Sequence, residues 1–316
     1  MRFRTIASVV AGAAALALVV SGCSSSSTPS ASSVASAAES VASQAQSAAS
    51  SVASRASGAV SSVQSAVSGA VADSQLLSSA ENGNLVVGIK FTQPGLGMKN
   101  SDGTFSGFDV EVAKYVAKEL GVDPAKIEFV EANSNQREDL IAKDQVDYIV
   151  ATYSITPERA QKVNFAGPYF VAHQDLLVKA DNTDITGPDT INGKIVCSVT
   201  GSTPAKRIKE NYPEAGLVER DTYSACVTEL QGGTVDAVST DDVILAGYAA
   251  QYPGQFKLVG KGFSDENYGI GLKKDDAAGT AAINAALVKM IADGSWKTAL
   301  QETVDQSDFT APTPGS

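Results

Sequence analysis

Three stretches of the chain carry charged or hydroxyl side chains where an apolar, strand-like segment gives way to a helix. Residues 151–159 (ATYSITPER) end in Arg159, residues 199–203 (VTGST) precede a second helix, and residues 235–241 (VDAVSTD) end in Asp241. In open α/β sheets, ligands bind where strands end. A planar guanidinium can pair both oxygens of a carboxylate. The three stretches are therefore candidates for ligand binding.

Each charged group also has a structural interpretation that the sequence leaves open. Thr156 and Pro157 predict an N-cap and a first helical residue, so Arg159 could be a surface residue of that helix. Asp241 and Asp242 could only cap the next helix, where the helix dipole favours an acidic side chain. Neither interpretation requires a ligand.

The elements that must position these stretches alternate between strands and helices, which predicts mainly parallel sheets. They cover about 220 residues, which is long for one core and suits two lobes. Strands are expected at residues 85–89, 127–130, 148–151, 194–197 and 237–239. Helices are expected at residues 108–120, 136–143, 203–212, 245–252 and 277–296.

The start of the chain has the layout of a secretory signal peptide. Two arginines precede an uncharged run over residues 6–20, and small residues stand directly before Cys23. The run is too short to cross a bilayer comfortably. Its end resembles the bacterial lipobox, which implies that residues 1–22 are removed and that Cys23 carries a lipid anchor.

A segment of low complexity follows. Residues 24–74 consist almost entirely of Ala, Ser and Val and contain no aromatic residue, so they cannot build a core. We interpret residues 23–83 as the lipidated cysteine and a tether, for which helical, disordered and self-associating forms remain open. Residues 305–316 are interpreted as a disordered tail.

The remaining cysteines and the charge narrow the class of protein. Without Cys23, only Cys197 and Cys226 remain, and an even number in an exported chain suggests one disulfide, with two buried free thiols as the alternative. His173 is the only histidine, which makes a catalytic cysteine improbable. The formal net charge of −11 makes the chain a poor nucleic-acid ligand.

The chain is similar to the type II periplasmic amino-acid-binding family in several separate motifs between residues 84 and 304. Besides the three stretches above, these are residues 107–112 (GFDVEV) and residues 268–273 (YGIGLK). The resemblance implies an α/β fold of two lobes, each a mainly parallel sheet flanked by helices, joined by two hinge crossovers. It places lobe 1 at residues 84–170 and 267–304, and lobe 2 at residues 171–266.

The resemblance also implies roles for individual residues. The α-carboxylate of an amino acid would be held by Ser154, Arg159, Gly201 and Ser202. The α-amine would be held by Asp241 and the Thr152 carbonyl. Thr200, Thr203 and Tyr153 would line or flank the same site, and His173 would be a hinge residue.

The residue after the first strand bears on the ligand's side chain. It is Lys90, which offers donors and no acceptor and so favours a carboxylate over an amide. Ser134 and Arg137 resemble the corresponding residues of the family's binders of acidic amino acids. The alternatives are a solvated Lys90 and an Arg137 that begins a surface helix.

The chain most resembles actinobacterial glutamate-binding lipoproteins of ABC importers. This predicts a monomeric lipoprotein on the outer face of the cell membrane, which delivers glutamate, or else aspartate, to a permease. Asparagine and glutamine remain open as ligands, and an amino-acid sensor and a dehydratase-like enzyme remain as alternative functions. No catalytic residue, cofactor or metal ion is expected.

Overall fold

The structure is a computed structural model that describes residues 74–304 and residue 314. The expected signal peptide, Cys23, most of the expected tether and nearly all of the expected tail lie outside the described residues. Within residues 74–304, no helix is long and apolar enough to cross a membrane.

The strands follow the expected alternation with helices, with additional strands beside them. They are β1 (Leu85–Ile89), β2 (Thr92–Gln93), β3 (Gly97–Lys99), β4 (Phe105–Ser106), β5 (Ile127–Glu131), β6 (Tyr148–Ile149), β7 (Asn164–Lys179), β8 (Ile195–Val199), β9 (Gly216–Arg220), β10 (Ala237–Asp241), β11 (Phe256–Leu258) and β12 (Asp265–Leu272).

The helices match the expected positions, with three additions and with ends that differ by a few residues. They are α2 (Gln75–Glu81), α3 (Phe108–Glu119), α4 (Arg137–Ala142), α5 (Pro157–Ala160), α6 (Thr203–Asn211), α7 (Tyr223–Gly232), α8 (Asp242–Gln251), α9 (Ala277–Ala292) and α10 (Ser295–Thr303), with 3-10 turns η1 (Pro124–Lys126) and η2 (Pro188–Thr190).

Two groups of parallel strands are joined by a long antiparallel pair. In one group β1 pairs with β5 and β6, and in the other β8 pairs with β9 and β10. Between them β7 pairs antiparallel with β12 and β10, giving the order β5-β1-β6-β12-β7-β10-β8-β9, with β11 also on β7. The fold is therefore mixed α/β, and the mainly parallel arrangement holds only for the strands outside β7, β11 and β12. A separate small antiparallel sheet has the order β2-β3-β4.

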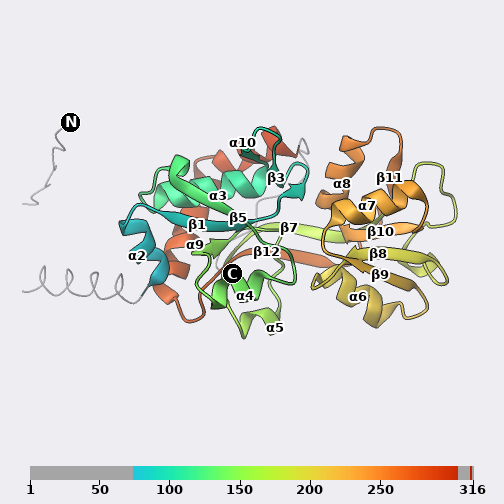
Figure 1. Ribbon diagram of the computed structural model, residues 1–316, viewed down its shortest axis with the longest axis horizontal. Helices are drawn as coiled ribbons and strands as arrows, with labels where there is room; N and C mark the ends of the chain where they lie inside the picture. Colours follow the sequence, from blue (N-terminus) through green and yellow to red (C-terminus); the bar gives the residue numbers. More distant parts are fainter. Residues whose placement is uncertain (1–73, 305–313, 315–316) are drawn as a thin grey trace, which may run out of the picture. The chain divides into compact units, whose positions relative to one another are not determined.

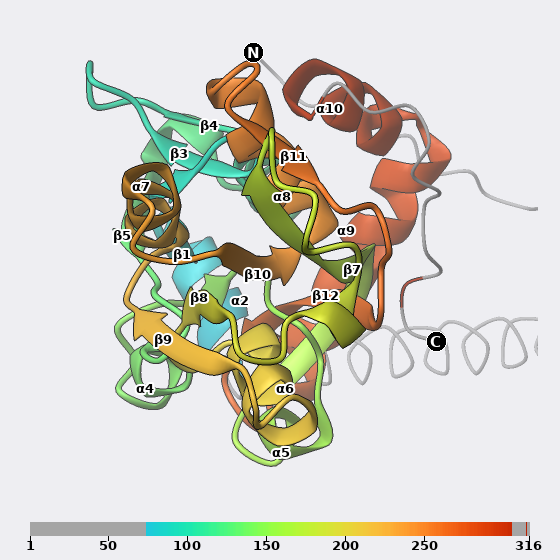
Figure 2. The ribbon, with the colours of Figure 1, turned by 90° about the vertical axis from the view of Figure 1, so that its right-hand side faces the viewer.

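We call the elements on either side of the β7/β12 pair lobe 1 and lobe 2. Lobe 1 comprises β1 to β6 with α2 to α5, α9 and α10, and lobe 2 comprises β8 to β11 with α6 to α8 (Figure 1). Figure 2 shows α6 on one face of β8, β9 and β10, and α7 and α8 on the other. Both expected lobe boundaries, 170/171 and 266/267, fall inside the two long strands.

An aromatic cluster forms part of the core of lobe 1. Phe108 of α3 meets Phe170 of β7 and Trp296 of α10 edge-on, with ring centroids 5.8 and 5.6 Å apart. The Trp296 indole donates to the Tyr169 carbonyl at 2.8 Å. Aromatic pairs of this geometry add to the free energy of burial, so the cluster fixes one end of β7 against α3 and α10.

Two expected boundaries are wrong. Residues 277–296 form two helices, α9 and the start of α10, because Gly294 adopts a left-handed conformation (φ 82°) between them. The packed part of the chain also begins before residue 84. Ser74 caps α2, and its hydroxyl donates to Asp276 at 2.8 Å, while Leu76 is buried against lobe 1.

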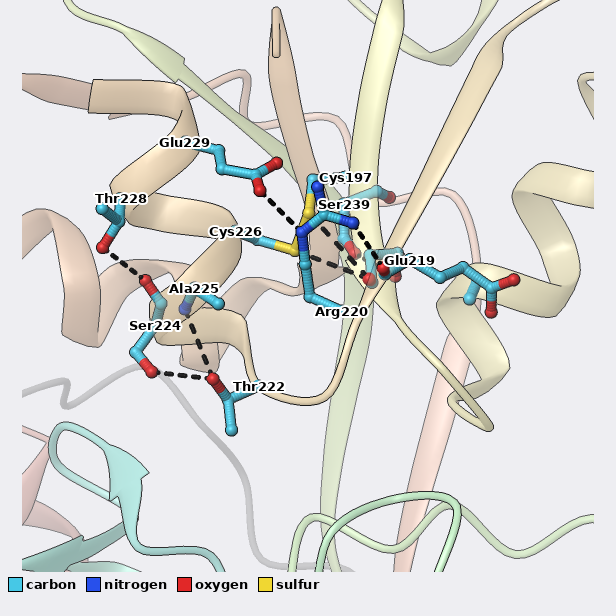
Figure 3. The surroundings of a disulfide bond; sticks show 12 residues. Cys197, Glu219, Arg220, Thr222, Ser224, Ala225, Cys226, Thr228, Glu229 and Ser239 are labelled. Atoms are coloured by element: carbon cyan, nitrogen blue, oxygen red, sulfur yellow. Dashed lines mark hydrogen bonds and ion pairs between the residues drawn. A yellow bond between two sulfur atoms is a disulfide. The ribbon is translucent and has the colours of Figure 1, made fainter. Parts of the chain in front are cut away.

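Cys197 of β8 and Cys226 of α7 form a disulfide, which confirms the expected pairing and excludes two free thiols (Figure 3). Beside it, Arg220 of β9 pairs with Glu229 of α7, at 2.6 Å between Nε and Oε1. Both links hold α7 against β8, which leads into the loop before α6, and against its neighbour β9.

Candidate functional site

Lys90 lies directly after β1 and is buried, with 5% of its surface exposed. Its Nζ donates to the Ser134 hydroxyl at 3.0 Å. Burial, followed by the charge of Arg137, lowers the pKa of Lys90 well below its ordinary value. The interpretation of Lys90 as a solvated lysine is therefore excluded.

Arg137 is the first residue of α4 and is 2% exposed, so it is not a surface residue. Its guanidinium lies 4.0 Å from the centroid of the Tyr153 ring. One terminal nitrogen donates to the carbonyls of Ala151 (3.0 Å) and Thr152 (3.3 Å). Its Nε is buried and has no hydrogen-bond partner among the described residues. Leaving a buried donor unpaired costs about 1–3 kcal/mol, so this nitrogen marks a place where a polar ligand atom would be stabilised.

Asp109 of α3 is a buried carboxylate that interacts electrostatically with both Lys90 and Arg137. It accepts hydrogen bonds from the Thr152 amide (3.0 Å) and the Tyr169 hydroxyl (2.7 Å). Burial raises the pKa of Asp109 to about 6, although these bonds and the charges of Lys90 and Arg137 oppose the rise. A single carboxylate, Asp109, thus acts on both of the buried basic side chains, Lys90 and Arg137.

Arg159 connects the two lobes. Thr156 caps α5 by accepting from the Arg159 amide at 3.2 Å, which turns the side chain inward, and Arg159 is only 8% exposed. Its Nη1 donates to the Ser154 carbonyl (2.7 Å) and its Nη2 to the Gly201 carbonyl of lobe 2 (2.9 Å). The surface interpretation of Arg159 is therefore wrong.

The loop before α6 brings lobe 2 against lobe 1. Gly201 has a φ of 78°, and a Cβ at this position would lie 2.9 Å from the Asn135 Cα, so glycine is required on both counts. Ser202 caps α6 by accepting from the Ala205 amide at 3.0 Å. The Thr200 amide donates to the Arg220 carbonyl at 3.0 Å, which ties the loop to β9. The predicted residues Gly201 and Ser202 thus lie beside Arg159, whereas Thr200 anchors the loop.

Asp241 ends β10 and stands at the N-cap position of α8, yet its side chain makes no capping hydrogen bond. It is 3% exposed; Oδ2 accepts from the Tyr268 hydroxyl at 2.5 Å, and Oδ1 has no hydrogen-bond partner within the described part of the chain. Burial, followed by the charge of Glu266, raises the pKa of Asp241 well above its ordinary value. The capping interpretation therefore fails for Asp241, and the arrangement suits a bound cation.

Asp242 points the other way. It accepts from the His173 amide at 3.1 Å and lies 3.2 Å from the His173 Nδ1, while Nε2 lies 3.4 Å from Asp265. His173 is thus a satisfied residue on β7, beside the crossover between the lobes.

A groove of about 710 Å³ opens where α5 meets α6. It is lined by residues of both lobes, including Glu158, Arg159, Gly201, Ser202, Thr203 and Lys206. Lys206 of α6 pairs with Glu158 of α5 at 2.5 Å across the lobes. The groove therefore gives access from solvent to the Arg159 side of the site.

Several residues of the site were not found by sequence reasoning. Tyr223 of α7 is buried, and burial, followed by the charge of Asp241, raises its pKa to about 12. Tyr268 and Asp109 belong to the motifs at residues 268–273 and 107–112, for which the sequence predicted no contact with a ligand. Their contribution depends on contacts between distant segments, which leave no local signal.

The predicted residues thus converge from two sides. Lobe 1 supplies buried side chains, with the carbonyls beside Arg137, and lobe 2 supplies the loop before α6 and the end of β10. They are Lys90, Ser134, Arg137, Thr152, Ser154 and Arg159 from lobe 1, and Gly201, Ser202, Thr203 and Asp241 from lobe 2. Cys23 lies outside the described residues.

Known proteins are similar to this chain in sequence and in fold. The model of the bacterial extracellular solute-binding proteins, family 3, matches residues 85–304. The glutamate-binding protein GluB of Corynebacterium glutamicum is 50% identical over 251 residues, which cover 76% of this chain and 85% of GluB. The ABC transporter glutamine-binding protein GlnH of Bacillus subtilis is 39% identical over 222 residues, covering 70% of this chain and 81% of GlnH.

Solved structures have a similar fold. An ancestral arginine-binding protein bound to glutamine has a TM-score of 0.67 and 34% sequence identity, covering 71% of this chain and 99% of that chain. The family match extends over nearly all of the described residues, from β1 to the end of α10. The chain therefore belongs to family 3 of the bacterial extracellular solute-binding proteins.

Proposed function

We propose that this protein is the substrate-binding lipoprotein of an ABC importer and binds an acidic amino acid, with glutamate favoured over aspartate, between its lobes. The observation that carries the proposal is the burial of two basic side chains of lobe 1, Lys90 and Arg137. A carboxylate in the ligand's side chain would compensate the buried positive charge, whereas an amide would not.

The backbone end of the ligand would be held by groups of both lobes. We propose that Arg159 and the amides of Gly201 and Ser202 bind the α-carboxylate, since a guanidinium and a helix start both favour an anion. Asp241 and the Thr152 carbonyl would bind the α-ammonium group. Ser134 would assist the two cations at the distal carboxylate.

Ligand-dependent closure fits this division of groups. Because the groups for the amino-acid backbone come from both lobes, a ligand that engages them stabilises the closed arrangement over the open one. The permease would recognise that closed arrangement. We further propose that Cys23 is lipidated and holds the monomeric protein at the outer face of the cell membrane, and that binding rather than catalysis is its activity, as in the named relatives.

Isothermal titration with glutamate, aspartate, glutamine and asparagine tests the proposal. Glutamate should bind most tightly, and at about 100 times its Kd it should add about 2.7 kcal/mol to the free energy of unfolding. Absence of both heat and a thermal shift with all four amino acids would contradict an amino-acid-binding role. Tightest binding of an amide would contradict the choice of an acidic ligand.

A further inference from the structure

Glu266 is a buried carboxylate at the point where the chain returns from lobe 2 to lobe 1. It lies on β12, opposite Ala172 of β7, and is 2% exposed. Its Oε2 accepts from the Thr203 hydroxyl at 2.7 Å, and its Oε1 accepts from Arg207 at 2.8 Å and from the Ser264 hydroxyl at 3.1 Å. Glu266 therefore contacts a residue of the proposed ligand site without being exposed to solvent.

The hydrogen bonds of Thr203 and Ser154 have only one consistent direction. A hydroxyl carries one proton, and Thr203 donates its proton to Glu266. In the contact of 3.2 Å between the Ser154 and Thr203 hydroxyls, Ser154 must then be the donor. Both hydroxyl oxygens then have only lone pairs to offer a ligand. They can accept from an ammonium group but cannot donate to a carboxylate. Ser154, for which the family resemblance implies a contact with the α-carboxylate, is therefore better suited to the α-amine.

Glu266 also contributes charge. Burial by itself raises its pKa, but hydrogen bonds, among them those from Thr203 and Arg207, outweigh burial and leave the pKa below its ordinary value. Glu266 is therefore ionised at neutral pH. Its charge acts on Asp241, so the amine side of the site contains two carboxylates, which Arg207, paired with Glu266 at 2.8 Å, partly compensates.

We propose that Glu266 is a positioning residue for the ligand's α-ammonium group. It holds the Thr203 and Ser154 protons away from the site, so that both hydroxyl oxygens accept from the ammonium, and it adds a second negative charge behind Asp241. This inference rests on the proposed function and assigns the preference for an α-amine partly to a residue that does not itself touch the ligand.

Glu266→Gln in the full chain is the direct test. The glutamine amide can donate to Thr203, which would turn the hydroxyl proton toward the ligand. We expect the affinity for L-glutamate to fall about tenfold. L-2-hydroxyglutarate, in which a hydroxyl replaces the ammonium group, should lose less than about threefold. Glu128→Gln, an exposed change on β5, is the control and should alter neither affinity.

Equal losses for the two ligands would overturn the inference, since a merely structural role affects both alike. Wild-type protein that binds no acidic amino acid would contradict the proposed function instead. A second measurement uses glutamate alone: in a Thr203→Val background, Glu266→Gln should cost less affinity than in the wild type, and additive losses would overturn the inference. If thermal unfolding shows that Glu266→Gln does not fold, Ser154→Ala is measured in its place. Ser154→Ala must then weaken glutamate binding more than 2-hydroxyglutarate binding. Any other result would overturn the inference.

Discussion

The two ends of the site are built differently. At the distal end, Lys90, Ser134 and Arg137 all belong to lobe 1 and are buried among its own elements. At the other end, Arg159 of lobe 1 donates to the Gly201 carbonyl of lobe 2, and Asp241 also belongs to lobe 2. One end is complete within a single lobe, and the other is complete only when the lobes meet.

This difference separates two properties of the protein. The groups that we propose distinguish one ligand side chain from another all belong to lobe 1, so their arrangement should not depend on closure. The groups that we propose bind the amino-acid backbone come from both lobes, so they should depend on closure and contribute affinity to any amino acid. Substitutions at the distal end should therefore change selectivity, whereas substitutions at the closure end should change all affinities together.

The largest effect is expected from Asp241→Asn. Losing one charged partner of a buried ammonium should weaken glutamate and glutamine binding alike, by about a hundredfold or more. Asp242→Asn is the matched control, because Asp242 contacts His173 and not the site. Titration calorimetry of both variants checks this, and a loss confined to one of the two ligands would break the proposed division.

Lys90→Met should change selectivity instead. Removing a buried charged hydrogen bond should weaken glutamate binding about tenfold or more, and glutamine binding far less. Lys99→Met is the control, since Lys99 is exposed over the Phe91 ring. Equal losses for glutamate and glutamine would show that Lys90 lies outside the side-chain end of the site.

Gly247→Ala tests closure of the lobes at a position outside the proposed ligand site. Gly247 of α8 approaches lobe 1 so closely that a Cβ would lie 2.3 Å from the Pro94 carbonyl oxygen, while the next residue, Tyr248, donates to the Thr92 carbonyl at 2.6 Å. Since alanine favours a helix over glycine, folding should be preserved. We expect the affinities for glutamate and glutamine to fall together, by about fivefold.

Gly232→Ala is the matched control for closure. Gly232 also lies in a helix, α7, but a Cβ there would meet open space. Thermal unfolding without ligand should show that neither variant is destabilised. A drop in glutamate affinity for Gly232→Ala of the same size would mean that the loss does not arise from the contact between lobes.

The smallest effect concerns alkaline pH. Burial lowers the pKa of Lys90, so its positive charge is lost at a lower pH than that of an ordinary lysine. The ratio of glutamate to glutamine affinity should therefore fall as the pH rises above neutrality; titration of the ligand's own amine affects both amino acids and cancels in the ratio. Lys90→Arg stays charged and should hold the ratio constant. Kd measurements across a pH series check the slope.

Local patterns in the sequence predicted the elements that carry the site. The apolar run at residues 85–89, the N-cap Thr156 and the helix expected from residue 203 are short-range signals, and each has the expected structure. The disulfide followed from counting cysteines. These features depend on neighbours in the chain or on composition alone, so a single sequence contains enough information.

Features that depend on distant contacts could not be predicted. Strand β7 contains Gly167 and Pro168, which normally end a strand, and pairing with β12 along much of its length overrides that preference. The burial of Lys90 and Arg137 was an open question in the sequence, because a charged residue next to a strand or at a helix start is usually solvated. The direction of the Thr203 hydroxyl depends on Glu266, which is far from it in the chain.

The helix at the start of the packed chain has a mechanical consequence. Helix α2 is fixed to lobe 1, since Leu76 is buried in its core and Ser74 bonds to Asp276 just before α9. A force applied to the chain ahead of Ser74 would therefore load lobe 1 alone. The β7/β12 pair would remain free to twist, so a protein held from that end could still open and close its second lobe without working against its own attachment.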